Sequence, residues 1–531
     1  MRFTPLLVLL ALVACGGRER CDACETISIA AVGEPGSVLP PLVQETVGRD
    51  IGDQIYERLA ALTPPGSPLD PAAYRPALAT RWERVDSLAW RFHLRPGARW
   101  HDGRPVTSDD VRFSFDAFAD SVFGAPARPY LAGRVSVEPE DSATFLIRFT
   151  EPSPEQLYDA TYHVRIIPKH VWEGEPRESW AADTAVARLV GSGPYRPARW
   201  VRGQFAELVA DSASRPTARI RRVIWRFTAD PDAALNLVLS HEADVLETAI
   251  GPERVRRAQA DSALRVTSYP SAAFGFLGFN LRAAGGGPHR VLGETNTRRG
   301  LALATDRTLL ARSVFGADAK APPGPMSQLL WLWSDSIPTL PFDRLEADRT
   351  LSAAGWRMDP RDSVRRRQGK PLALDILVPS TSGARRRLAE ELQQMWRQVG
   401  ARVTVTAVDF PVFQERLAAG RFDAYIGAWL DEPSARGIAD QWSRTGWEGS
   451  NYGRYASTEF DSLLGAAMRE PRVDQATRLY RAALARLNSD APAIFLYSPA
   501  NAAVVNRRVA DFALDPYSWA AELRQWRLTG P

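Results

Sequence analysis

The sequence predicts an α/β protein built from more than one domain, and three observations lead to this prediction. The chain has 531 residues, whereas a single hydrophobic core rarely organises more than about 250–300 residues. Strand-like and helical segments alternate between residues 372 and 430, which predicts parallel strands joined by right-handed helical crossovers. The hydrophobic fraction of 45% and the charged fraction of 24% are typical of folded globular domains.

The first residues form a targeting segment rather than part of the fold. Arg2 provides a positive charge, residues 6–14 are apolar, and Cys15 follows directly. The apolar run is shorter than the roughly 20 residues that a membrane-spanning helix needs, so we predict a signal peptide at 1–14. The residues around Cys15 resemble a bacterial lipobox, which implies a lipidated Cys15 and a tether at 15–25. A plain secretory signal, in which Cys15 has no role, is the alternative.

The tether also contains Cys21 and Cys24 in a C-x-x-C pattern. Outside the cytoplasm, this spacing favours a local disulfide, and two free thiols are the alternative. A thioredoxin-like redox motif would begin a helix, and no such unit follows these cysteines. A metal site would need two further ligands, and with Cys15 lipidated no other cysteine or histidine lies close in the sequence. We therefore predict no metal at this position.

The charge distribution argues against nucleic acid as a partner. The net charge is +4, and the basic residues are spread along the chain, whereas a phosphate-binding surface needs a concentrated basic stripe. Of the 66 basic residues only three are lysines (positions 169, 320 and 370), which leaves 63 arginines. Because arginine is so abundant, the sequence does not indicate which arginine would bind the carboxylate of a ligand.

Motif spacing predicts no catalytic site. The six histidines show no H-E-x-x-H spacing for zinc. Ser192 lies in V-G-S-G-P rather than in a G-x-S-x-G nucleophile elbow. No serine stands three residues before a lysine, which excludes an S-x-x-K motif, and every cysteine lies in or beside the tether. We therefore expect a protein that is not an enzyme and that has no cofactor.

Helices and strands can be predicted in order along the first part of the chain. Thr26–Val32 reads as a strand, which a glycine- and proline-rich turn at 33–36 ends. Residues 49–62 fit an amphipathic helix with Ile51, Ile55 and Leu59 on one face. The three prolines and one glycine at positions 63–68 predict a loop and a domain boundary.

The segment at 88–118 contains a second predicted strand and a capped helix. Apolar and charged residues alternate from Trp90 to Leu94, as in a half-buried strand. Pro-Gly at 96–97 and Asp-Gly at 102–103 then predict turns. Thr107 and Asp110 form a capping-box pattern. The following helix places its apolar residues on one face, namely Val111, Phe115 and Phe118.

Further segments follow the same rules. Residues 143–149 are strand-like, and Gly-Ser-Gly-Pro at 191–194 predicts a break. In the second half, the predicted strands are 372–378, 403–408 and 422–429, and the predicted helices are 385–399, ended by Gly400, and 411–419. Ligands of such sheets bind beyond the carboxyl ends of the strands. Asp431 is the first acidic residue after the strand at 422–429, so we expect it at a cleft.

The order of many residues resembles one known family. The matching residues are R-P-A-L-A at 75–79, Trp82, Glu83, F-H-L-R at 92–95, Gly97, H-D-G at 101–103, D-D-V at 109–111, G-S-G-P-Y at 191–195, F-L-G-F-N at 276–280, R-R-G-L-A-L-A-T-D-R at 298–307, Phe422, Asp423, Gly427, Trp429, Asp431, Asn451, Tyr452 and D-A-P at 490–492. Together they resemble the family 5 extracellular solute-binding proteins, which are the oligopeptide, dipeptide and nickel receptors of ABC importers. Gly300 departs from the family pattern, in which a larger residue is common.

The resemblance implies a two-lobed periplasmic-binding-protein-like fold (cluster C) with an additional subdomain. The expected lobe I core consists of residues 26–62, 191–272 and 504–531, with the extra subdomain at 63–190 and lobe II at 273–503. The chain is expected to cross the hinge between the lobes twice, near residues 269–274 and 498–504.

The resemblance also implies a function. We expect a monomeric, lipid-anchored receptor on the periplasmic side of the cell envelope that closes over a short peptide and delivers it to an ABC permease. The lipid anchor would be its only attachment to the membrane. Within this fold, a receptor for another solute, such as a nickel chelate, an opine or an oligosaccharide, is the alternative. A non-transport sensory or interaction protein is the alternative from another class.

Five residues are the expected ligand contacts. In peptide receptors of this family, an aspartate after the matching tryptophan pairs with the α-ammonium of the ligand, which implies this role for Asp431. The spacing from Gly427 is one residue tighter than in some members, so Glu432 is the alternative. Trp429 would form a wall of the pocket, and Tyr452 and Asn451 would donate hydrogen bonds to the peptide backbone. Helix capping by Asp431, a core position for Trp429 and a turn role for Asn451 remain open.

Overall fold

The computed structural model describes residues 25–64, 66–183, 185–214, 217–283 and 285–529. Cys15, Cys21 and Cys24 lie outside these ranges, so the lipid anchor and the disulfide stay predictions. Within the described ranges, no helix is both long and apolar enough to cross a membrane.

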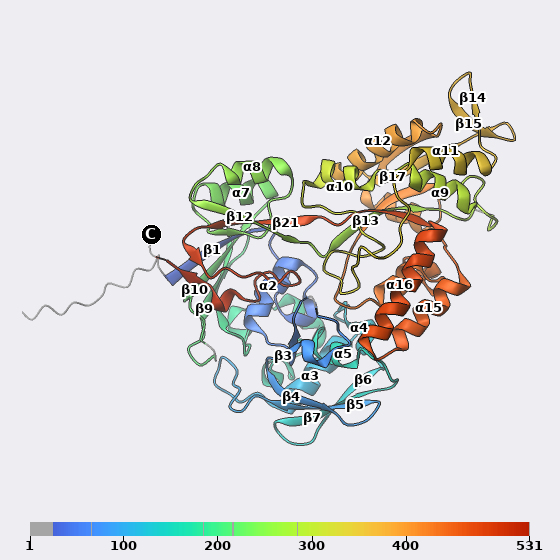
Figure 1. Cartoon of the computed structure of the whole chain (residues 1–531). Helices are drawn as coiled ribbons and strands as arrows, with labels where there is room; N and C mark the ends of the chain where they lie inside the picture. The colour runs from blue at the N-terminus through green and yellow to red at the C-terminus, as the bar shows by residue number, and fades with distance from the viewer. Residues whose placement is uncertain (1–24, 65, 184, 215–216, 284, 530–531) are drawn as a thin grey trace, which may run out of the picture.

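The described chain forms two lobes, each built on its own sheet (Figure 1). We call lobe I the part that carries the seven-stranded sheet, whose strand order is β12-β21-β11-β1-β10-β9-β8. Strand β1 pairs in parallel with β10 and β11, and the other neighbours are antiparallel. Its strands are β1 (Thr26–Val32), β8 (Tyr195–Val201), β9 (Phe205–Ala210), β10 (Arg222–Thr228), β11 (Val245–Leu246), β12 (Leu264–Pro270) and β21 (Ala500–Asn506), and its helices are α2 (Thr46–Ile55), α7 (Pro231–Leu239) and α8 (Pro252–Gln259).

Lobe I also carries a subdomain, which lies at the bottom of Figure 1. Its four-stranded antiparallel sheet has the order β4-β5-β7-β6 and packs against helix α3. The elements are β2 (Ala60–Leu62), β3 (Tyr74–Pro76), β4 (Ala79–Arg84), β5 (Ala89–Leu94), α3 (Ser108–Ala119), α4 (Arg128–Leu131), β6 (Val135–Pro139), β7 (Thr144–Phe149), α5 (Gln156–Thr161) and α6 (Lys169–Trp172). Its separate core is centred on Phe92 and Phe145, whose rings stack at 5.7 Å.

Lobe II is built on a five-stranded sheet of order β18-β17-β19-β13-β20. Its strands are β13 (Ala273–Phe279), β17 (Ala373–Pro379), β18 (Arg402–Val408), β19 (Ala424–Leu430) and β20 (Ala493–Tyr497). Its helices are α9 (Thr295–Leu303), α10 (Arg307–Phe315), α11 (Arg344–Ala353), α12 (Gly383–Arg397), α13 (Phe410–Ala418), α14 (Gly437–Trp442), α15 (Thr458–Arg469) and α16 (Val473–Asp490). A small sheet projects from this lobe, formed by β14 (Arg357–Asp359), β15 (Val364–Arg367) and β16 (Lys370–Pro371).

Short elements complete the chain. The last segment of lobe I pairs β22 (Val509–Ala510) with β23 (Arg527–Leu528). Single 3-10 turns are found at Pro40–Leu42, Pro71–Ala73, Arg177–Ala182, Val186–Arg188, Arg444–Glu448 and Leu523–Gln525.

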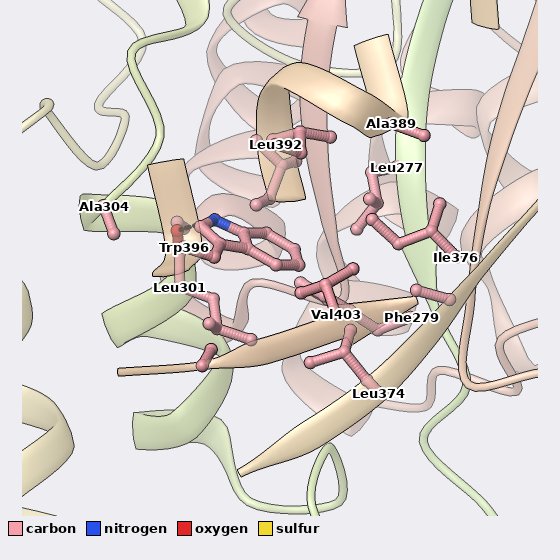
Figure 2. Close-up of a cluster of buried hydrophobic side chains, with 14 of the residues drawn as sticks. Leu277, Phe279, Leu301, Ala304, Leu374, Ile376, Ala389, Leu392, Trp396 and Val403 are labelled. Atoms are coloured by element: carbon pink, nitrogen blue, oxygen red, sulfur yellow. Dashed lines mark hydrogen bonds between the residues drawn. The ribbon is translucent and has the colours of Figure 1, made fainter. Parts of the chain in front are cut away.

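The core of lobe II contains the large aromatic side chain of Trp396 (Figure 2). Trp396 of α12 is fully buried, and its indole N–H donates hydrogen bonds to the Leu301 carbonyl at 3.0 Å and the Thr305 hydroxyl at 2.9 Å. Its ring lies 6.3 Å from that of Phe279 on β13. The tryptophan therefore ties helix α12 to both the sheet and the end of α9, because a buried indole needs a partner for its polar edge.

The chain passes between the two sheets twice. It leaves lobe I between β12 and β13 and returns between β20 and β21, at residues 271–272 and 498–499. Strand β21 starts at Ala500, ahead of residue 504, where we expect the last segment of lobe I to begin. The assignment of the subdomain and of the lobe boundaries by residue remains a prediction.

Several family motifs meet each other in the structure. His101 donates from Nε2 to the Gly193 carbonyl at 3.1 Å, and its Nδ1 accepts from the Gly191 amide at 3.1 Å. Burial lowers the pKa of this imidazole, which keeps it neutral. A Cβ atom on Gly191 would lie 1.9 Å from the Ile55 carbonyl oxygen, so no other residue fits there. The H-D-G and G-S-G-P motifs are therefore packing motifs that hold the subdomain on α2.

The structure corrects two of the predicted elements. The predicted helix at 49–62 is instead α2, which ends at Ile55, and residues 60–62 form strand β2. The Ile55 carbonyl accepts from Gly193 and the Arg58 carbonyl from Leu78, so distant segments replace helical partners. The sheet of lobe II is mixed rather than parallel, because β13 and β20 join it antiparallel to their neighbours. The predicted strands and helices between 372 and 430 are present with ends shifted by a few residues.

Candidate ligand-binding site

A cavity of about 430 Å³ lies between the two lobes. Helix α2 and residues 516–519 line it from the lobe I core, residues 162–165 from the subdomain, and residues 430–432 from lobe II. Ser271 and Ala272, where the chain crosses between the sheets, also contribute to its wall. The cavity is therefore placed where relative movement of the lobes would open or close it.

Asp431 reaches this cavity because β19 ends at Leu430. Its amide donates to the Ala272 carbonyl at 2.8 Å, and one carboxylate oxygen accepts from the Ser327 amide at 2.5 Å. Burial raises the pKa of Asp431 to about 7, against the lowering effect of the Ser327 amide. Among the described residues, none forms an ion pair with Asp431. The site thus holds a carboxyl group whose charged form needs a cation from outside the protein.

Glu432 also lines the cavity. Its carboxylate accepts from the Tyr158 hydroxyl of the subdomain at 3.4 Å, so it contributes to the contact between the lobes. Burial raises the pKa of this carboxyl group as well.

The other three predicted contacts lie outside the cavity wall. Asn451 is 2% exposed, and its side chain bonds to the Ser443 and Tyr455 backbones, which is a structural role in the turn. The ring of Tyr452 lies 6.1 Å from that of Tyr425. Trp429 packs against a core cluster of lobe II that includes Phe276 and Tyr425. We therefore keep only Asp431 and Glu432 in the candidate site.

Helix α2 contributes charged residues that sequence reasoning missed. Asp50 accepts from the Trp519 indole at 2.8 Å. Burial raises the pKa of Asp50 well above its usual value, and the nearby Glu247 raises it further. Arg49 lines the same wall, and its Nε has no hydrogen-bond partner among the described residues. The sequence contained one indication that Asp50 is buried. It directly precedes Ile51, which the helical pattern places on the buried face of α2.

A paired cluster supports the base of this wall. Asp53 accepts from Arg165 at 2.8 Å and lies 3.4 Å from Arg58, and both guanidinium groups hold the pKa of Asp53 far below its usual range despite burial. Ser518 donates to the same carboxylate at 3.0 Å. This cluster is satisfied within the protein, so it positions α2 rather than offering a free charge.

Arg436 of lobe II joins the lobes beside the cavity. Its guanidinium lies 2.7 Å from Glu155 and 2.5 Å from Asp159, both on or next to helix α5 of the subdomain. It also covers the ring of Tyr130 at 4.9 Å, and Ser434 donates to Glu155 at 2.6 Å. The lobes are thus held in contact by a network in which the two carboxyl groups are almost fully buried.

Metal-ligating side chains do not gather in the described part of the chain. No group of three or more histidine, cysteine, aspartate or glutamate residues there has an arrangement suited to a metal ion.

An α/β chain folded into two lobes, with a cavity lined from both, defines a two-lobed ligand-binding protein. Residues 73–449 match the family described as bacterial extracellular solute-binding proteins, family 5. The chain belongs to this family, as the resemblance in the sequence indicated.

Known proteins similar to this chain bear names of binding proteins. The periplasmic oligopeptide-binding protein OppA of Salmonella typhimurium is 24% identical, and the match covers 95% of this chain and 94% of OppA. The solved structure of the oligopeptide-binding protein AppA from Bacillus subtilis, in complex with a nonapeptide, superimposes with a TM-score of 0.73 at 20% identity over 95% of this chain and 99% of AppA. NikZ from Campylobacter jejuni, in complex with Ni(L-His), gives the same TM-score at 21% identity over 95% and 99% of the two chains.

Proposed function

We propose that this protein is the lipid-anchored, extracytoplasmic binding protein of an ABC importer and that it closes over short peptides. Asp431 carries the proposal, because its carboxyl group lies in the cavity between the lobes and has no cationic partner among the residues that the structure describes. The α-ammonium of a peptide would supply that partner, and the two together form a charge-assisted hydrogen bond. The names of OppA and AppA support the same class of ligand.

Other groups of the cavity suit the remaining parts of a peptide. The Arg49 Nε and the Tyr517 hydroxyl have no hydrogen-bond partner among the described residues, and both residues line the cavity. Donors of this kind match the carbonyl groups of an extended peptide backbone. The permease would recognise the closed protein with its enclosed ligand, because closure changes the combined outer surface of the two lobes.

Peptide binding is expected to change the shape of the protein and its fluorescence. The chain has 16 tryptophans, and Trp519 lines the cavity. We expect a diverse peptide mixture to raise the melting temperature, to change tryptophan emission and to reduce the radius of gyration in X-ray scattering. Native mass spectrometry of the purified protein would identify any peptide that remains bound. If no peptide co-purifies and none shifts the melting temperature, peptide binding is wrong.

A different solute is the second candidate, and the similarity to NikZ favours testing it. The same thermal-shift assay with nickel plus L-histidine, with opines and with oligosaccharides separates these ligands from peptides. A shift with one of them, and none with peptides, would keep the transport function and replace the substrate.

The lipid anchor makes a separate prediction. We expect Cys15→Ser to move the protein from the membrane fraction to the soluble fraction, because the acyl chains would supply the attachment. Mass spectrometry should find the acyl chains on the parent protein and none on the variant. Unchanged fractionation and unchanged mass would contradict the predicted lipidation.

A further inference from the structure

The cavity between the lobes holds more carboxyl groups than cations. Six acidic residues line it, and the two arginines among its lining residues are Arg49 and Arg165. Arg165 is already paired with Asp53, and His163 is neutral because burial lowers its pKa to about 3. The acidic residues are Glu45, Asp50, Asp53, Glu247, Asp431 and Glu432.

Asp50 and Glu247 form the part of this excess that lies on the lobe I wall. Asp50 is 2% exposed; one of its oxygens accepts from Trp519, and the other has no hydrogen-bond partner among the described residues. Glu247 follows strand β11 and is half-buried, and burial raises its pKa to about 7. Neither carboxyl group forms an ion pair with any described arginine, lysine or histidine.

Arg49 balances this wall only in part. It stabilises the charged forms of Asp50, Glu247 and Glu432, since it lowers the pKa of each against the larger effect of burial. One guanidinium thus acts on three carboxyl groups, of which Glu432 is stabilised more by Arg436 than by Arg49. A buried carboxylate without a partner is unfavourable and tends to take up a proton, which is the direction of both pKa shifts. A cation at this wall would instead stabilise the charged forms of Asp50 and Glu247.

We infer that the cavity selects peptides with a lysine or arginine side chain, whose cationic group binds against Glu247 and Asp50 on lobe I. This inference rests on the proposed function, in which the α-ammonium pairs with Asp431 of lobe II. A ligand with both cations connects the two walls of the cavity. Binding of such a ligand therefore favours the closed arrangement more than binding of a peptide with one cation.

Matched peptides test this inference directly. Tripeptides of alanine carry, in turn at each position, lysine, acetyl-lysine, arginine or citrulline, so that each cation has a neutral counterpart of similar shape. Isothermal titration with the purified protein measures each affinity. At one position at least, we expect the cationic peptide to bind at least about tenfold more tightly than its neutral counterpart.

Variants locate the cation. Glu247→Gln should reduce this preference to about threefold or less, while the neutral peptides retain their affinity. Glu247→Asp, which keeps the charge, should retain a clear preference. Glu253→Gln is the matched control, because Glu253 is exposed on α8 and, in the part of the chain that the structure describes, forms its one ion pair with Arg256.

The outcomes separate the two proposals. If peptides bind but show no preference for a cation at any position, the inference is overturned and peptide binding stands. A preference that persists unchanged in Glu247→Gln also overturns it, because the cation is then recognised elsewhere. If no peptide binds at all, the proposed peptide ligand is wrong and the inference is wrong with it.

Discussion

Asp431→Asn is expected to reduce peptide affinity by well over tenfold. The carboxylate would lose its charge while its shape, and its acceptor for the Ser327 amide, are kept. A buried α-ammonium would then lack a charged partner, and truncating one side of such a pair typically costs about 2–5 kcal/mol. Titration calorimetry with a free-amine peptide measures the loss.

An N-acetylated peptide provides the control for this result. It lacks the ammonium group, so it should bind weakly to the parent protein and lose little more in Asp431→Asn. Equal affinity of parent and variant for the free-amine peptide would show that Asp431 does not contact the ammonium. Glu432→Gln would then be the next variant to test, since Glu432 lines the same cavity.

The same carboxyl group predicts how affinity depends on pH. Because the pKa of Asp431 is raised to about 7 in the free protein, acid protonates it and removes the charge that the ligand needs. Affinity should therefore rise from pH 5 to pH 8, by up to tenfold per pH unit below pH 7. Glu247 titrates in the same range, so the difference between parent and Asp431→Asn isolates the contribution of Asp431.

Without ligand, the stability of the fold should depend on pH in the opposite direction. A carboxyl group whose pKa is raised on folding binds a proton more tightly in the folded state. Its contribution to the free energy of unfolding is therefore lost as the pH rises from about 4 to about 7. The melting temperature of ligand-free Asp431→Asn at pH 8 should consequently be no lower than that of the parent.

Arg436→Ala is expected to separate the lobes and to weaken binding of every ligand. The change leaves Glu155 and Asp159 without their cation, and both are almost fully buried in the present contact. Removing one partner of a buried ion pair typically costs about 3–5 kcal/mol. Here the lobes can avoid much of this cost by moving apart, because Glu155 and Asp159 then become hydrated. We expect a larger radius of gyration in scattering and an affinity at least about tenfold lower for all peptides.

Arg478→Ala is the matched control for this change. Arg478 has a side chain that is 63% exposed, and it pairs with Asp474 at 2.9 Å within helix α16. It should leave both the radius of gyration and the affinity unchanged. If Arg436→Ala also leaves both unchanged, the contact between Arg436 and helix α5 does not govern closure.

Local sequence rules worked where neighbouring residues set the structure. Thr26–Val32 is the strand that its pattern predicts, and helix α3 starts after Thr107 with Asp110 accepting from the Thr107 amide at 2.8 Å. The rules failed for residues 56–62, since carbonyl groups there bond to segments more than a hundred residues away or in another sheet. The spacing of apolar residues cannot distinguish a helix that continues to residue 62 from one that ends at Ile55. Leu59 would be buried in the continued helix, and it is buried in the observed structure.

The candidate site was predicted only in part for a similar reason. Asp431 follows from the end of a buried strand, a position that any strand in such a sheet directs toward a cleft. Asn451 and Trp429 matched family spacings equally well, yet one is used inside a turn and the other packs on the core. Spacing along the chain does not report which face of an element a side chain occupies.

The sequence by itself determined the family and the α/β class, together with the two acidic residues that follow β19, because motif spacing and hydrophobic period depend on nearby residues. Only the tertiary structure decided that Asp50, Glu247 and Asp431 share one cavity and that Arg436 joins α5. Asp50, Glu247 and Asp431 are separated from one another by more than a hundred residues. Their charge balance arises from burial and proximity in space, which depend on how the two lobes meet.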